Sequence, residues 1–217
     1  MLLYHGTSIS HVQSILKKGV VPRLRKKGNW DEYPSHHKYV YLTTAYALYF
    51  SMHTKDKKDK ENALVVMFEI DSEKLNEEKL FPDEDFLVQA SVYSQKDVKH
   101  KDVHFAIRDK LDNYQHLWKD SVERMGNCSY QGTIPPSAIT RYVVADLTKH
   151  GQLLMCMLDP SISIMNFLIK GKYYENFIKW FFRDQELMPT VEDIGYFREG
   201  EEKQKYLDFW IAESKNR

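Results

Sequence analysis

The sequence predicts an α+β fold for the N-terminal part of the chain, followed by a helical C-terminal extension. Short runs of β-branched and aromatic residues, typical of strands, alternate with segments in which apolar residues recur every three or four positions, as in amphipathic helices. After residue 146 only the helical spacing recurs. We therefore expect one domain over residues 1–146 and a helical extension packed on it over residues 147–217.

The first predicted elements are a strand, a turn and a helix. Leu2 to Tyr4 predicts a short strand that Gly6 breaks. Ser8 or Ser10 can cap a helix that stops at Gly19. Residues 20–38 show no apolar period, so they are expected to form a loop.

A second strand and helix follow that loop. Residues 39–44 are β-branched and aromatic, and residues 45–51 have helical spacing. The polar run at 53–62 is expected to be a solvated loop. The apolar run ALVVMFEI at 63–70 predicts a strand in the interior of a sheet, with a short helix capped by Asp71 directly after it.

The remaining elements of the domain are a long helix and two strands. Residues 86–90 are a weaker strand prediction. Residues 103–125 carry the strongest helical period in the chain, which Gly126 ends. Strands at 128–134 and 140–147 are expected to be joined at a Pro-Pro turn, because proline cannot lie within a central strand.

Composition excludes several classes of protein. The 217 residues are 42% hydrophobic and contain 31 basic and 31 acidic side chains, so the net charge is zero and a uniformly basic nucleic-acid-binding surface is excluded. The longest apolar runs are far shorter than a membrane span. Cys128 and Cys156 are the only cysteines, too few for a disulfide framework or a four-thiolate metal site. We expect a cytoplasmic protein without a membrane partner or a metal.

Two motifs carry candidate chemistry. Tyr4-His5-Gly6-Thr7 lies where a strand ends and a helix begins, and Gly6 there lets a ligand approach the backbone. His5 is either a ligand-binding side chain or a turn residue satisfied by the protein itself. Further on, the segment Tyr41-Leu42-Thr43-Thr44 leads into a helix that contains Tyr49.

Together with GTIPPSAI at residues 132–139, these motifs resemble the ADP-ribosyltransferase superfamily, in particular its diphtheria-toxin and poly(ADP-ribose) polymerase branch. The resemblance covers about residues 1–146 and implies a split antiparallel β-sheet with NAD+ held in the cleft between its halves. It also implies a set of cofactor-binding residues. His5 would hold the adenosine-side ribose hydroxyls, the Gly6 backbone would pair with the nicotinamide amide beside Thr7, and Tyr41 and Tyr49 would wall the nicotinamide.

The family's third element is an acid, and this chain departs from the pattern there. Breaking the nicotinamide–ribose bond builds an oxocarbenium-like charge that a carboxylate or strong acceptor stabilises. In the family a catalytic Glu opens the strand that runs into the segment IPPSAI, but here that strand reads NCSYQG. Gln131 on the strand and Glu123 on the preceding helix are the candidates for this role. The alternative is that both are merely exposed polar side chains.

Basic residues gather in the predicted loop that would flank the NAD+ pyrophosphate. No acid interrupts the run from Lys17 to Lys27, and an aromatic residue follows it. Such a loop can bind phosphates or an acceptor nucleic acid, with the aromatic ring as a stacking surface, or it can simply be solvated. The candidate phosphate- or acceptor-binding residues are Arg23, Arg25, Lys26, Lys27 and Trp30.

These observations predict a mono-ADP-ribosyltransferase that uses NAD+ as co-substrate and modifies a macromolecule, with a nucleic-acid base slightly favoured over protein. A bacterial or phage-conflict toxin is the expected biological class. Two alternatives stay open. One is a catalytically inactive NAD+- or ADP-ribose-binding module, which the missing acid favours. The other is an RNA 2′-phosphotransferase-like enzyme, which needs no catalytic Glu but has an Arg where Tyr4 stands. Residues 147–217 are expected to pack on the first domain or to bind a partner such as an antitoxin.

Overall fold

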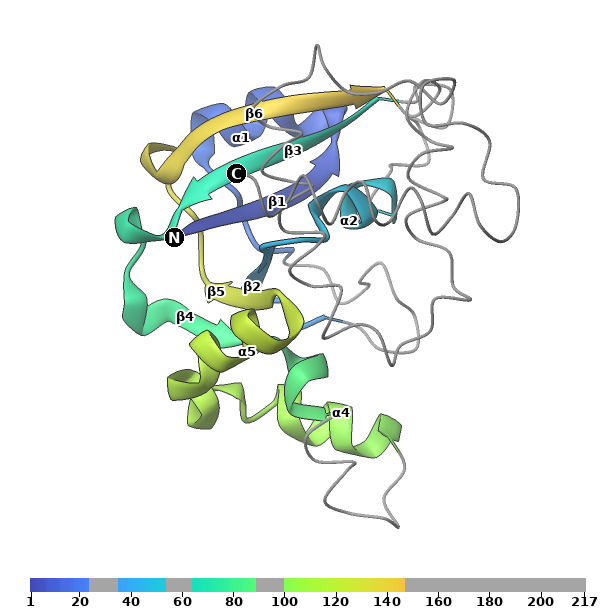
Figure 1. Ribbon diagram of the computed structural model, residues 1–217, viewed down its shortest axis with the longest axis vertical. Coiled ribbons are helices and arrows are strands. Elements are labelled where there is room, and N and C mark those ends of the chain that lie inside the picture. The colour runs from blue at the N-terminus through green and yellow to red at the C-terminus, as the bar shows by residue number, and fades with distance from the viewer. Residues whose placement is uncertain (24–34, 54–63, 89–99, 147–217) are drawn as a thin grey trace, which may run out of the picture.

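The computed structural model describes residues 1–23, 35–53, 64–88 and 100–146 (Figure 1). Over these residues the protein has an α+β fold with a six-stranded antiparallel sheet in the order β4-β5-β2-β1-β3-β6. This confirms the predicted class. The predicted extension at 147–217 lies outside the described residues. The strands are β1 (Leu2–Ser8), β2 (Tyr39–Thr43), β3 (Leu64–Asp71), β4 (Leu80–Pro82), β5 (Asn127–Gln131) and β6 (Ile139–Asp146).

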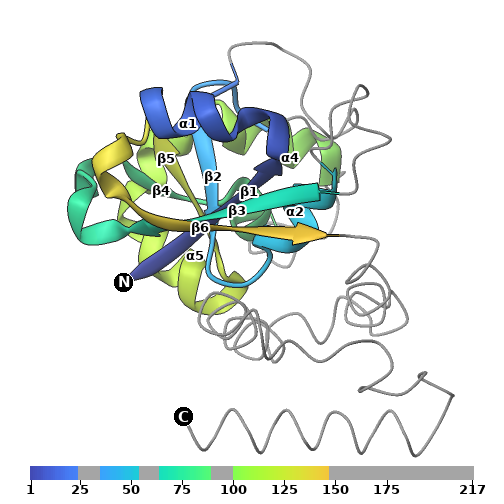
Figure 2. The same cartoon turned by 90° about the horizontal axis from the view of Figure 1, so that it is seen from above.

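The sheet consists of two half-sheets that meet at one point. β1 pairs with β3 over its whole length and β2 pairs with β5 over its whole length, but β1 and β2 share a single registered pair, Tyr4 with Thr43. β6 extends the first half-sheet beside β3, and β4 extends the second beside β5. In Figure 2, β2 crosses the direction of β1 and β3 at a steep angle. We call the place where β1 and β2 separate, just after Tyr4, the split.

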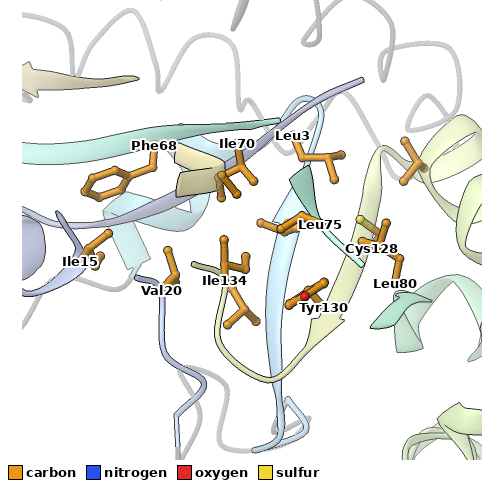
Figure 3. Packing of buried hydrophobic residues seen from close by; sticks show 14 of the residues in the cluster. Leu3, Ile15, Val20, Phe68, Ile70, Leu75, Leu80, Cys128, Tyr130 and Ile134 are labelled. Atoms are coloured by element: carbon orange, nitrogen blue, oxygen red, sulfur yellow. The ribbon is translucent and has the colours of Figure 1, made fainter. Parts of the chain in front are cut away.

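The main hydrophobic core lies between the two half-sheets. Alternation along the strands points Leu3 and Phe68 of one half toward Cys128 and Tyr130 of the other (Figure 3). A second apolar cluster covers the opposite face of β2, where the side chains of Tyr39 and Tyr41 lie. β2 therefore has a buried layer on each side, which explains why its sequence is apolar or aromatic at every position from 39 to 42.

The helices are short and end where glycine permits. α1 (Val12–Lys18) stops at Gly19 and α5 (Trp118–Met125) stops at Gly126, and both glycines have positive φ, as predicted from the sequence. α2 (Ala47–His53) packs on β1 at Gly6, where a Cβ atom would lie 1.8 Å from the carbonyl oxygen of Ala47. None of the helices in the described ranges has the length and apolar character needed to cross a bilayer.

Three predictions are wrong. Gly6 does not break the first strand, because β1 stays paired with β3 through His5, Gly6 and Thr7 to Ser8, so the motif lies within a strand and not at its end. Residues 84–88 form a helix, and not the strand predicted at 86–90, because the Asp83 carboxylate caps it by accepting a hydrogen bond from the Asp85 N–H at 2.8 Å. The single helix predicted over 103–125 is interrupted at residues 109–110. It consists of α4 (His100–Arg108), the 3-10 helix η5 (Leu111–Leu117) and α5. The apolar period persists because each piece has one buried apolar face: Ile107 and Leu111 belong to the second cluster, and Trp118 and Val122 of α5 belong to the main core.

The remaining elements are 3-10 helices, which the sequence predicts in part. The helix predicted after Asp71 is confirmed as η3 (Ser72–Lys74), and the Pro-Pro turn between the last two strands contains η6 (Pro136–Ala138). The others are η1 (Ile9–His11) and η4 (Glu77–Lys79). Together η3 and η4 carry the chain from β3 in one half-sheet to β4 in the other.

Candidate functional site

His5 lies at the split, and its Nδ1 is 3.0 Å from the backbone oxygen of Tyr41. A carbonyl oxygen only accepts hydrogen bonds, so Nδ1 carries the proton in this contact and Nε2 of a neutral ring is left as an acceptor. Burial lowers the pKa of His5, the hydrogen bond to Tyr41 opposes that shift, and the nearby Arg23 and His11 add to it. At pH 7 His5 is therefore a neutral acceptor beside a cation.

On the other face of β2, the Tyr41 phenol contacts a buried carboxylate. The hydroxyl of Tyr41 donates a short hydrogen bond to Glu84 Oε1, and the backbone N–H of His36 donates to both the Tyr41 oxygen, at 2.8 Å, and Glu84 Oε1, at 3.2 Å. We call these three residues the Tyr41 cluster. Burial raises the pKa of the Tyr41 phenol, and the charge of Glu84 raises it further. The sequence-predicted Tyr41 is thus held in a single arrangement by groups on two other segments.

Gln131 lies on the same face of the second half-sheet as Tyr41 but contacts a different tyrosine. β5 pairs with β2 so that Gln131 is opposite Tyr39 and Ser129 is opposite Tyr41. Gln131 Nε2 donates to the Tyr39 hydroxyl at 3.4 Å, and that hydroxyl donates to Asp112 Oδ1 at 2.8 Å. Gln131 is therefore close to the Tyr41 cluster in the sheet, while its hydrogen bond goes to Tyr39.

The first residue of β5 stands where the resemblance places the family's Glu. Here it is Asn127, which is 6% exposed and whose Oδ1 has no hydrogen-bond partner among the described residues. Glu123 is exposed on α5, whose buried residues, Trp118, Ser121, Val122 and Met125, lie on its other positions. The structure thus does not bring Glu123 to the Tyr41 cluster.

The other predicted site residues are distributed as follows. Gly6 and Thr7 are buried on β1, with Gly6 directly under α2. Tyr49 belongs to α2, but its side chain lies outside what the structure describes. Arg23 is at the surface and close enough to lower the pKa of His5. The predicted residues Arg25, Lys26, Lys27 and Trp30 lie outside the described residues.

Sequence reasoning missed Asp83 and Glu84, both of which are buried. Burial raises the pKa of each carboxyl group, and in Asp83 the charges of Asp85 and Glu84 raise it further. A signal for them existed in PDED at 82–85, where a proline ends a strand and an acid can cap a helix. Within the described ranges, no group of three or more His, Cys, Asp or Glu side chains could hold a metal ion.

Comparison of the chain with models of protein families and with curated proteins found no match.

Proposed function

We propose that the protein is a mono-ADP-ribosyltransferase that transfers ADP-ribose from NAD+ to a macromolecular acceptor. The observation that supports this proposal is the split, where the sheet opens beside a neutral His5 and a cationic Arg23. Nε2 of His5 can accept a hydrogen bond from a ribose hydroxyl, and a guanidinium matches the geometry of a pyrophosphate. The separation of the half-sheets agrees with the split sheet that the resemblance implies, and the ADP-ribosyltransferase fold itself is part of the proposal.

In the proposed reaction the bond between nicotinamide and ribose breaks, and nicotinamide leaves with the bonding electrons. A nucleophilic atom of the acceptor forms the new bond to the ribose carbon, and the proton that this atom loses goes to solvent. Tyr41 and Tyr49 are proposed to wall the nicotinamide, with the Gly6 backbone and Thr7 beside it. No metal takes part.

A nucleic-acid base is the acceptor that we favour over protein. Three exposed basic residues follow β1 in the sequence, namely Lys17, Lys18 and Arg23. They begin the basic run that continues to Arg25, Lys26 and Lys27. Such a run attracts a phosphate backbone, and Trp30 offers a surface on which a base can stack. A cytoplasmic toxin held in check by an antitoxin is the biological role that we propose for this activity.

A catalytically inactive NAD+- or ADP-ribose-binding module is the second candidate. Asn127 stands where the family's acid is expected, and Gln131 is already hydrogen-bonded to Tyr39. Under the enzymatic proposal, the hydrogen-bond acceptor that replaces the family's catalytic Glu is the side chain of Gln131 or of Glu123. Loss of that group should lower kcat about tenfold, or roughly 1.4 kcal/mol of transition-state stabilisation, with little change in KM.

The decisive experiment incubates the full chain with NAD+ labelled in the adenylate and with cell extract, followed by separate nuclease and protease digestion. We expect label that nuclease removes and protease does not. His5→Ala should abolish transfer and weaken NAD+ binding about tenfold in calorimetry, while the exposed His116→Ala should match the wild type. Binding without transfer would favour the inactive module. Full transfer by His5→Ala would contradict the site assignment.

A further inference from the structure

Glu84 is a carboxylate in an apolar place. It is 2% exposed and lies in the first turn of the helix at 84–88, whose neighbours Leu87 and Val88 belong to the apolar cluster on the outer face of β2. A hydrophobic side chain there would pack without the desolvation cost that a carboxylate carries. Its presence calls for an explanation in terms of what it contacts.

The sheet register explains how Glu84 reaches Tyr41. Phe81 of β4, Ser129 of β5 and Tyr41 of β2 are opposite one another across three adjacent strands. β4 ends at Pro82, and the chain then turns into the helix capped by Asp83. The first turn of that helix therefore lies over these three opposed residues. The Glu84 carboxylate contacts the Tyr41 phenol on the face of β2 that carries the second apolar cluster.

The hydrogen bonds of Glu84 show what kind of role it can have. Oε1 of its carboxylate accepts from both the Tyr41 hydroxyl and the His36 N–H. A carboxylate oxygen that accepts two hydrogen bonds from the protein is well suited to hold the groups that donate to it, here a phenol on β2 and the main chain at His36.

We propose that Glu84 is a positioning residue of the candidate site: its carboxylate fixes the Tyr41 phenol and the main chain at His36, so that Tyr41 keeps the orientation in which it walls the nicotinamide. This inference rests on the proposed function. His36 follows closely after the basic segment that contains Arg25 and Trp30. The same carboxylate therefore also holds the main chain at His36, six residues after Trp30 in the sequence.

The first test is NAD+ affinity by calorimetry, with a double-mutant cycle. We expect Glu84→Ala to raise Kd about tenfold, Glu84→Gln to raise it less because its amide oxygen still accepts from Tyr41, and Glu84→Ala/Tyr41→Phe to be no weaker than the weaker single variant. Glu69→Gln is the matched control. Glu69 is also a buried carboxylate, at 4% exposure, but it pairs with Arg141 at 3.1 Å in the other half-sheet. Its Kd should match the wild type.

Two outcomes of this test would overturn the inference alone: an unchanged Kd in Glu84→Ala, or additive losses in the cycle. A wild type that does not bind NAD+ would overturn the proposed function, and the inference with it. A loss of affinity equal in Glu69→Gln and Glu84→Gln would also contradict the inference, because it would show a general effect of removing a buried carboxylate.

The second test needs no NAD+ and remains informative if Glu84→Ala does not fold. Tyrosine labelled with carbon-13 at Cζ reports the titration of each phenol by NMR, and Tyr41→Phe assigns the signal. In Glu84→Gln the Tyr41 pKa should fall, because the charge that raises it is gone while burial and Asp83 remain. In Glu69→Gln it should not move. An unchanged Tyr41 titration in Glu84→Gln would show that the carboxylate does not act on the phenol, and would overturn the inference.

Discussion

Burial shifts the pKa values of titratable side chains near β2 in opposite directions. It lowers the pKa of His5 and raises the pKa of Asp83 and of Glu84, because it disfavours the charged form of each group. For His5 the result is a neutral acceptor at pH 7. For the two carboxylates the result is a cost to folding whenever they ionise.

Asp83→Asn should therefore stabilise the fold, and more so as the pH rises. The raised pKa means that the folded state binds the Asp83 proton more tightly than the unfolded state, so the wild type loses stability as pH rises from the ordinary carboxyl value, about 4, toward the raised one. Asparagine keeps the cap on the Asp85 N–H and carries no charge. Urea unfolding at about pH 4, 5.5 and 7 measures the difference.

The control for Asp83→Asn is Asp71→Asn. Asp71 caps η3 in the same way, through the Glu73 N–H at 3.1 Å, but at a more exposed position. Its substitution should change stability by less than about 0.5 kcal/mol throughout. A stability gain in Asp83→Asn that stays constant across this pH range would show that the carboxyl group is not the source of the effect.

At the scale of elements, the sequence predicts most where one residue decides the local conformation. Gly19 and Gly126 end helices because each adopts a positive φ, and the β-branched and aromatic run at 39–43 forms a strand. β4 could not be predicted, since it has three residues including Pro82 and exists because β5 pairs with it. The break at residues 109–110 is also hidden, because the apolar period continues across it.

The candidate site divides in the same way. His5 and Tyr41 stand in local motifs, so the sequence locates them. Glu84 meets Tyr41 only because β4 and β5 bring distant segments together, and no local pattern reports a pairing of that kind. The position of Gln131 opposite Tyr39 also depends on register, and one residue of shift would have turned its side chain to the other face.

Two glycine substitutions should lower the free energy of unfolding for different reasons. In Gly6→Ala the new Cβ would lie 1.8 Å from the Ala47 carbonyl oxygen, so α2 must move, and we expect a loss of about 3 kcal/mol or more. In Gly132→Ala the Cβ meets nothing within 4 Å, and only the φ of 89° opposes it, at about 1 kcal/mol. Urea unfolding compares the two; equal losses would contradict the close contact of α2 with β1.

At the scale of the whole molecule, the charges sum to zero, so any attraction to a polyanion must come from their distribution. Reversal of Arg25, Lys26 and Lys27 to Glu should weaken transfer to RNA or DNA and flatten its dependence on salt. Reversal of the exposed Lys74, Lys79 and Lys110 changes net charge equally and serves as the control. Transfer of labelled ADP-ribose to RNA and DNA, measured across a salt series, compares the two triple variants. Identical behaviour of the two triple variants would point to a protein acceptor.

The strand order also governs what happens while the ribosome is still making the chain. β2 and β4 both pair with β5, and β3 pairs with β6. Each of these three strands therefore lacks at least one of its neighbours until residues 127–146 have been synthesised. Pairing between segments so far apart in sequence is slow, and unpaired strands expose edges that favour aggregation. Nascent chains that end before β5 therefore contain His5, Tyr41 and Glu84 but lack the strand that aligns β2 with β4. The site can form only once synthesis of the domain is nearly complete.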